Sequence, residues 1–101
     1  MSGPDKRQHA RNSISLTGIL RAGNAADASA VGCEIQDLSV GGVRIALAAP
    51  MDVPTAVVLE IGQFGSYAAE VAWADYPVFG LRFKESPETM VEMITAVALH
   101  A

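Results

Sequence analysis

Residues 31–47 read VGCEIQDLSVGGVRIAL and contain two runs in which apolar and polar side chains alternate. The runs cover residues 31–36 and 43–47, and the intervening DLSVGG, residues 37–42, is rich in turn-forming residues. Alternation with a period of two is typical of a strand that buries one face. This stretch therefore predicts two neighbouring strands joined by a turn.

Four more strands are expected on either side of this pair. Residues 14–20 alternate in the same way and precede a small, polar loop over residues 22–30. Downstream, Pro50 and Pro54 predict a connection, because proline does not suit a central strand. After the prolines, strand-like runs cover residues 56–61, 66–73 and 79–84.

The last segment changes period and predicts a helix over about residues 86–100. Ser86, Pro87 and Glu88 supply a hydroxyl cap, a first-turn proline and an acid near the positive end of the helix dipole. Apolar residues then recur at the helical positions 90, 93, 94 and 97. Six short strands and one terminal helix predict a mostly β fold, a six-stranded antiparallel β-barrel with a C-terminal α-helix that covers one end.

The composition indicates one domain and excludes several classes of protein. The chain has 101 residues, a net charge of −4 and a single cysteine, which excludes an internal disulfide. No apolar run reaches the roughly 18 residues of a membrane span, and the polar start has no secretory h-region. A cytoplasmic protein without membrane insertion is therefore expected. The acidic balance argues against nucleic-acid binding.

The charge is distributed unevenly along the chain. Residues 1–21 carry a net charge of +3 and residues 22–101 a net charge of −7. Residues 1–12, MSGPDKRQHARN, lack periodicity, so we expect a flexible basic arm there, followed by the barrel domain over residues 13–101. The arm is either a solvated tail or a segment that grips a small anion.

Signatures of enzymes are absent from the sequence. His9 and His100 have no partners at metal-ligand spacing, and both are expected in solvent. Ser39 lacks a G-x-S-x-G context, so a catalytic serine is not expected. Cys33 alternates with strand residues and is assigned to the core. A protein that is not an enzyme is therefore expected.

The aromatic residues of the late strands are expected to fill the barrel. Trp73, Phe79 and Phe83 lie in alternating strands and are assigned to the core. Few aromatic side chains then remain to stack on bases. Together with the acidic body, this disfavours an OB-like protein that binds single strands.

Two short clusters have the chemistry to bind an anion or a base. Arg7 and Arg11 form an R-x-x-x-R pair, a spacing that arises by chance in roughly one chain in four of this length. Asp37, Ser39 and Gly42 form a D-x-S-x-x-G turn between two strands. A purely structural interpretation also exists, because Asp and Ser bond nearby backbone groups in turns and glycine supplies a positive φ.

Together the two clusters resemble the ligand motifs of the PilZ domain family, whose members bind cyclic di-GMP in bacteria. The resemblance extends to Val71-Ala72-Trp73 and to the run Phe79-Gly80-Leu81-Arg82-Phe83, which are similar to the family's late strand pair. It covers about residues 5–100 and implies a stand-alone PilZ split barrel. Both ligand motifs are intact.

The resemblance implies a receptor whose ligand is cyclic di-GMP and which needs no cofactor or metal. Arginine forks fit guanine edges and phosphate oxygens bidentately, and a carboxylate accepts hydrogen bonds from guanine N1–H and N2–H₂. Serine both donates and accepts, and glycine lets the ligand approach the backbone closely. The implied site consists of Arg7, Arg11, Asp37, Ser39 and Gly42, with Lys6, Gly41 and Arg44 as additional candidates.

The expected mechanism is an order–disorder switch. The arm's own contacts cannot repay an ordering entropy of about 1–2 kcal/mol per residue, so the arm is expected to order only on the ligand. Ordering changes the surface that a downstream protein partner meets. The resemblance implies outputs in motility, biofilm adhesion or polysaccharide synthesis, from a monomer or weak dimer. The alternative is a protein-interaction adaptor of the same fold with weak or no ligand binding.

Overall fold

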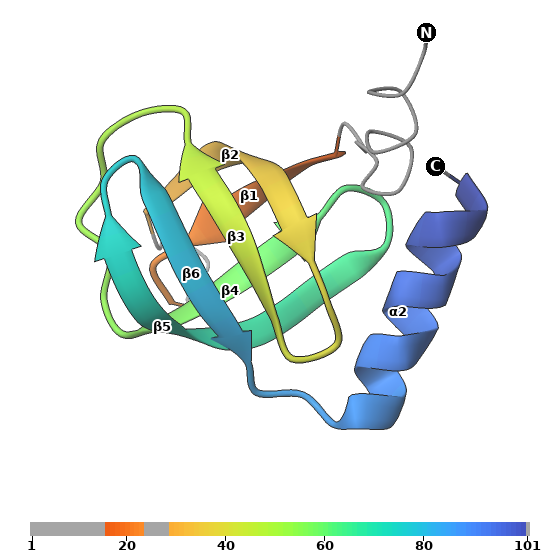
Figure 1. Cartoon of the computed structure of the whole chain (residues 1–101). Helices are drawn as coiled ribbons and strands as arrows, with labels where there is room; N and C mark the ends of the chain where they lie inside the picture. The colour runs from red at the N-terminus through yellow and green to blue at the C-terminus, as the bar shows by residue number, and fades with distance from the viewer. Residues whose placement is uncertain (1–15, 24–28, 101) are drawn as a thin grey trace, which may run out of the picture.

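Six antiparallel strands close into a barrel, and a helix follows them (Figure 1). The computed structural model describes residues 16–23 and 29–100. The strand order around the barrel is β1-β2-β3-β6-β5-β4. This confirms the fold class that the sequence predicts. The elements are β1 (Leu16–Arg21), β2 (Ala30–Leu38), β3 (Gly42–Leu47), β4 (Ala56–Ile61), β5 (Gly65–Asp75), β6 (Val78–Phe83) and α2 (Pro87–His100).

The barrel encloses an apolar core supplied by alternate residues of every strand. Leu20, Ile45, Leu59 and Ile61 are fully buried, and no polar or charged residue of the described chain is buried with them. Cys33 is 5% exposed, which confirms its assignment to the core. Burial raises the pKa of the Cys33 thiol to about 11, although a backbone hydrogen bond at Gly18 partly opposes the shift. The thiol is therefore held in its neutral, unreactive form.

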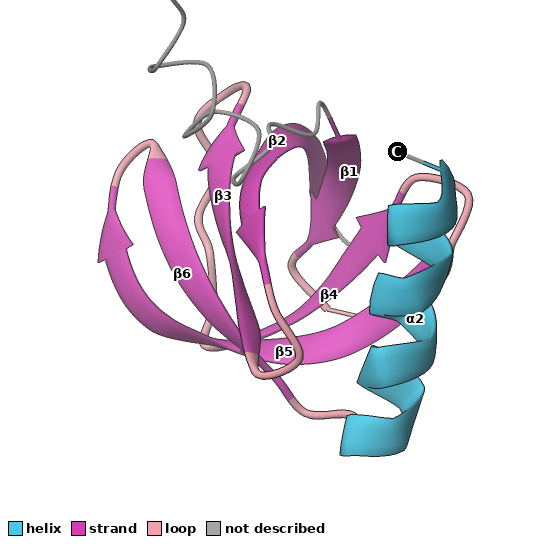
Figure 2. Ribbon diagram, turned by 45° about the vertical axis from the view of Figure 1, so that its right-hand side comes forward, coloured by secondary structure: helices cyan, strands magenta, loops and turns pink. Residues whose placement is uncertain are grey.

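Helix α2 lies across one end of the barrel, beside the turn between β4 and β5 (Figures 1 and 2). The predicted cap is present: Ser86 Oγ accepts a hydrogen bond from the backbone N–H of Thr89 at 3.2 Å. The side chains that enter the core from this helix are Met90, Met93 and Val97. Three apolar side chains on one helical face thus keep water from this end of the core.

Two strands carry an extra residue, and these bulges change which side chains face outward. On β2 the pairing with β3 shifts between Ile35 and Asp37, and on β5 the pairing with β6 shifts between Val71 and Trp73. A bulge reverses the inward–outward alternation beyond it. The assignment of Trp73 to the core is therefore wrong, because its side chain faces outward and is 48% exposed. Phe79 and Phe83 are buried as expected.

The second strand ends later than expected, because it continues beyond the bulge on β2. Pairing continues past the bulge to Leu38, opposite Val43, so Asp37 belongs to β2 and not to the following turn.

The predicted arm, residues 1–12, lies outside the described residues, and its flexibility stays a prediction.

Candidate functional site

Four residues form one row across the outside of the barrel. Asp37 on β2 lies opposite Arg44 on β3, and Arg44 lies opposite Gly80 on β6. Gly80 in turn lies opposite Trp73 on β5. Residues in register on adjacent strands share one face, with their Cα atoms about 5 Å apart. A carboxylate, a guanidinium and an indole from three different strands are thus brought into a line, with Gly80 of the fourth strand between the guanidinium and the indole.

The two bulges place the ends of this row on the outer face. Cys33 and Ile35 point inward, so simple alternation would turn Asp37 inward as well. The extra residue Gln36 turns the Asp37 carboxylate to solvent. At the other end, the extra residue Ala72 does the same for Trp73. Each bulge therefore turns one side chain of this row outward.

The row lines an open groove of about 270 Å³ on the outside of β2, β3, β5 and β6. Its walls include polar side chains at the β2 end and the indole at the β5 end. The lining residues are Asp37, Leu38, Ser39, Gly42, Val43, Arg44, Ala72, Trp73, Gly80 and Leu81.

Trp73 is held in the groove by the absence of a side chain at Gly80. A Cβ added to Gly80 would overlap Nε1, Cε2 and Cδ1 of the indole. Glycine inside a strand often marks such a close approach. One edge of the indole therefore packs on the backbone of Gly80 while about half of the side chain faces solvent.

The turn between β2 and β3 is closed by Ser39 and Gly42. The backbone N–H of Ser39 donates to the Gly42 carbonyl at 2.8 Å, and the Ser39 hydroxyl donates to the same carbonyl at 3.2 Å. The N–H of Gly42 donates to Ser39 Oγ at 3.3 Å. The Gly41 carbonyl accepts from the N–H of Phe83 at 3.1 Å, which ties the turn to β6. These bonds support the structural interpretation of Ser39, whose hydroxyl bonds within the turn.

The two glycines of this turn have different surroundings. A Cβ on Gly42 would lie 2.5 Å from the carbonyl oxygen of Leu81, whereas a Cβ on Gly41 would meet nothing within 4 Å. Neither glycine is in the left-handed region of φ, so the expected need for a positive φ is wrong at both. Gly42 is required instead for the close approach of β3 to β6.

A model of the PilZ domain family matches residues 5–98 of the chain. The protein belongs to the PilZ domain family. No curated protein matches the chain. PilZ domains bind cyclic di-GMP and act as effectors and not as enzymes.

In this PilZ domain the structure brings together five of the eight residues proposed from the sequence. Ser39, Gly41 and Gly42 form the turn, and Asp37 and Arg44 lie beside it. Lys6, Arg7 and Arg11 lie outside the described residues. The described chain begins at Leu16, opposite Ile35 of β2, two residues before Asp37. The first described residue thus lies beside the strand that carries Asp37.

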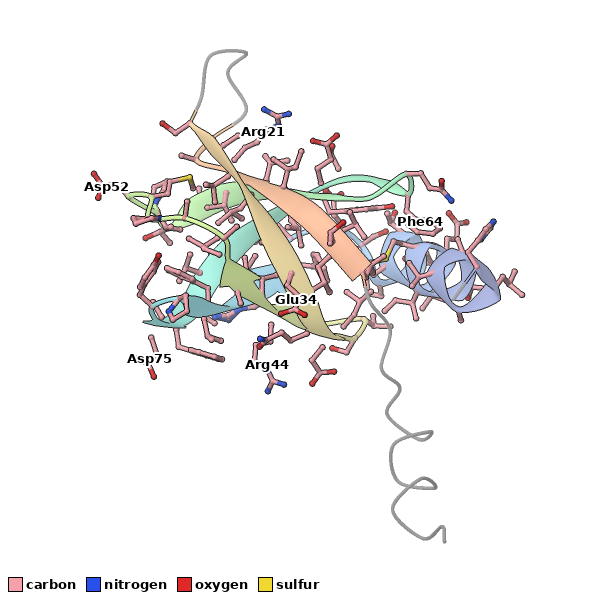
Figure 3. The ribbon with its side chains drawn as sticks, turned by 90° about the horizontal axis from the view of Figure 1, so that it is seen from above. Arg21, Glu34, Arg44, Asp52, Phe64 and Asp75 are labelled. Carbon is pink, nitrogen blue, oxygen red and sulfur yellow. The ribbon has the colours of Figure 1, made fainter. Side chains whose placement is uncertain are left out.

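Arg44 extends from the barrel surface with its guanidinium in solvent (Figure 3). Its Nε donates to Oε1 of Gln36, the bulge residue, at 3.2 Å. The bulge on β2 therefore exposes Asp37 and also orients the arginine opposite it. The other outward cations of this face, Arg82 and Lys84, lie near Glu70, with N···O distances of 3.5 and 3.4 Å.

Trp73 is the site residue that the sequence reasoning missed. Its alternation with Ala69 and Val71 indicates an inward side chain, and the bulge that reverses this direction leaves no local signal. The signal that was available is Gly80, a glycine between two core residues of a strand, which favours a close neighbour across the sheet.

Among residues 16–23 and 29–100, no three His, Cys, Asp or Glu side chains are grouped so that they could hold a metal ion. No helix in the described part of the chain is long and apolar enough to cross a membrane.

Proposed function

We propose that this PilZ domain is a receptor for cyclic di-GMP and that the ligand lies over the outer groove. The observation that carries the proposal is the cross-strand row, which places an accessible carboxylate, a guanidinium and an exposed indole in one groove. Each of these groups matches a different part of a ligand that has two guanines and two phosphodiesters.

The carboxylate and the indole suit a guanine base. Asp37 is an acceptor that matches the N1–H and N2–H₂ donors on one guanine edge. Trp73 offers a π-face, and stacking of a base on an aromatic side chain is worth about 1–3 kcal/mol by alanine substitution. Since Gly80 holds one edge of the indole, the ring is oriented before the ligand arrives.

The cation of the row suits a phosphate. Only Nε of Arg44 is bonded to a described side chain, Gln36, so its terminal nitrogens are available for bidentate contact with phosphate oxygens. Glu70 lies near both Arg82 and Lys84, so these two cations are less available.

The groove is too small and too open to hold the whole ligand without further residues. Its volume of about 270 Å³ is below the range of about 300–1,000 Å³ that is typical of small-molecule sites. Arg11 precedes Leu16 by five residues, a length of chain that spans at most about 18 Å. We therefore assign Arg7 and Arg11 to the clamp that completes the site, with Lys6 beside them.

Ordering of the arm on the ligand is the proposed signal. Contacts to charged groups, at roughly 1.5–3 kcal/mol per hydrogen bond, offset the entropy of ordering the arm. The changed surface is then available to a protein partner, in the cytoplasm of a bacterium. The residues proposed here bind a ligand, and no catalytic role is assigned to any of them.

Calorimetry of the full chain with cyclic di-GMP tests the proposal. We expect binding with a dissociation constant of about 1 μM or below, which corresponds to about −8 kcal/mol, and much weaker binding of GMP and GTP. Trp73→Ala should weaken binding about five-fold to 100-fold. Tyr76→Ala removes another exposed aromatic of the same hairpin outside the row and serves as the matched control.

Fluorescence adds an independent readout, because Trp73 is the only tryptophan of the chain. A guanine stacked on the indole should quench its emission in a saturable manner. The absence of heat and of quenching at low salt would refute the receptor assignment and favour the adaptor alternative. Equal losses in the Trp73 and Tyr76 variants would place the ligand elsewhere.

A further inference from the structure

A second groove lies at the end of the barrel opposite helix α2. It has a volume of about 510 Å³ and is formed by the β3–β4 connection and the β5–β6 turn. The backbone N–H of Leu47, at the end of β3, donates to the carbonyl of Pro77 at 2.8 Å and holds the two segments together. The lining residues are Pro50, Met51, Asp52, Tyr76 and Phe79.

The surface of this groove is mainly apolar. Phe79 is 6% exposed and belongs to the barrel core, and Met51 packs against that core. Tyr76 is 53% exposed, so about half of its side chain lies in solvent. A tyrosine combines a large apolar area with low conformational entropy, which is why tyrosines are enriched in the centres of protein interfaces.

The rim of the groove is negatively charged. Asp52 lines the groove, and Asp75 directly precedes Tyr76; both carboxylates extend from this end of the barrel (Figure 3). Within the described part of the chain, neither carboxylate forms an ion pair. Arg21, the last residue of β1, is paired with Glu60 at 3.2 Å, so its charge is balanced by that carboxylate.

We propose that this groove docks a segment of a partner protein in which an aliphatic or aromatic side chain is flanked by lysine or arginine. The apolar side chain would cover Met51 and Phe79, and the cations would meet the carboxylates of Asp52 and Asp75. A cation would also lie favourably over the face of Tyr76. The groove is open, whereas sites for small molecules bury about 70–90% of their ligand, so a protein segment suits it better.

The docking surface is separate from the proposed ligand site but lies on the same hairpin. Tyr76 and Phe79 lie in the β5–β6 hairpin, which also carries Trp73 and Gly80. The inference goes beyond the proposed function and does not depend on the binding of cyclic di-GMP. If the docking proposal fails, the proposed binding of cyclic di-GMP is unaffected, and the reverse also holds.

Amide chemical-shift mapping on the full, ¹⁵N-labelled chain tests the docking surface. The probe is a short synthetic peptide with a central Leu-Phe pair and two lysines on each side. Two matched peptides replace the lysines with glutamates or the Leu-Phe pair with serines. We expect saturable shifts at Met51, Asp52, Tyr76 and Phe79 with the first peptide only. Cyclic di-GMP is titrated into a separate sample, so the two sites are assessed independently.

Variants assign the effect to the groove. The combined change Asp52→Lys and Asp75→Lys should weaken binding of the peptide about five-fold or more, because each substitution removes one exposed ion pair with a lysine of the peptide. Glu92→Lys reverses the charge of one exposed carboxylate on helix α2, outside the groove, and should have no effect. Tyr76→Ser should weaken the peptide at least ten-fold. The amide spectrum of each variant shows whether the barrel is intact, and the paired aspartate change, at exposed positions, keeps the test valid if Tyr76→Ser unfolds.

Three results would overturn the proposal. The first is no shift at millimolar peptide. The second is an equal response to the glutamate peptide, which would remove the electrostatic basis. The third is a set of concentration-dependent shifts at the groove in the protein alone, which would show that a second copy of the chain occupies it.

Discussion

The packing of Trp73 on Gly80 makes Gly80→Ala the most informative single substitution. The added Cβ would overlap three atoms of the indole, so the ring has to leave its place. The ring is the end of a side chain that is 48% exposed, and it can swing into solvent while the backbone stays in place. The substitution therefore removes the oriented indole without deleting it.

The expected loss of stability follows from the surface that the indole buries. About half of an aromatic side chain corresponds to roughly 100 Å², which at about 25 cal/mol per Å² is worth about 2.5 kcal/mol. Alanine is favoured over glycine in a strand by about 0.5–1 kcal/mol, which offsets part of this loss. Gly80→Ala should thus lower the free energy of unfolding by up to about 2 kcal/mol.

A double-mutant cycle tests whether the clash between the new Cβ and the indole causes this loss of stability. In the Trp73→Ala background the new Cβ no longer meets the indole, so Gly80→Ala should be neutral or stabilising by about 0.5–1 kcal/mol. Urea unfolding followed by far-ultraviolet circular dichroism measures all four proteins, because the only tryptophan is lost in two of them. Gly32→Ala, at a strand glycine with no atom closer than 4.0 Å to its added Cβ, is the matched control.

Additive effects would refute the reasoning. If Gly80→Ala lowers the free energy of unfolding by the same amount with and without the indole, to within about 0.5 kcal/mol, the absence of a side chain at Gly80 does not hold Trp73 in place. Under the proposed function, Gly80→Ala should also weaken cyclic di-GMP about as much as Trp73→Ala does. Full affinity in the Gly80→Ala protein would remove the oriented indole from the ligand site.

Three further predictions concern the turn, the arm and the core. Gly42→Ala should lower the free energy of unfolding by about 1–3 kcal/mol, because its Cβ would lie 2.5 Å from the carbonyl oxygen of Leu81. Gly41→Ala should be nearly neutral, and equal melting temperatures of these two variants would contradict the prediction. Arg7→Ala or Arg11→Ala should abolish or greatly weaken ligand binding by calorimetry and leave the melting temperature of the free protein unchanged, and a large drop in that temperature would show that the arm is structural. The pKa of Cys33 is raised from 9.0 to about 11, so the unfolded chain loses this proton first and stability should fall between these pH values. The fall should be smaller in Cys33→Ala, and parallel curves for the two proteins would exclude the thiol as its cause.

Local patterns in the sequence were sufficient for the architecture of the barrel. The alternation around Cys33 and Ile45 predicts strands with the inward faces that the structure has. The Ser86-Pro87 start predicts the helix to within one residue of its observed beginning. These patterns depend on residues only a few positions apart, and so they are visible without knowledge of the fold.

The outward row is a different case, because its geometry depends on pairing between distant segments. The motif residues Asp37, Ser39 and Gly42 were identified from the sequence, but their surroundings were not. Whether Ala72 is an extra residue of β5 is settled by the register against β6, and no local property of Ala72 marks it.

The sequence by itself determined the strands, the helix, the family and the residue types of the candidate site. Tertiary structure alone decided that Trp73 faces outward over Gly80 and that Asp37 and Arg44 share its row. The physical reason is that side-chain direction in a strand has a period of two, so one inserted residue reverses it. The insertion becomes visible only when the neighbouring strand is in place, since a bulge is defined by two residues that oppose one.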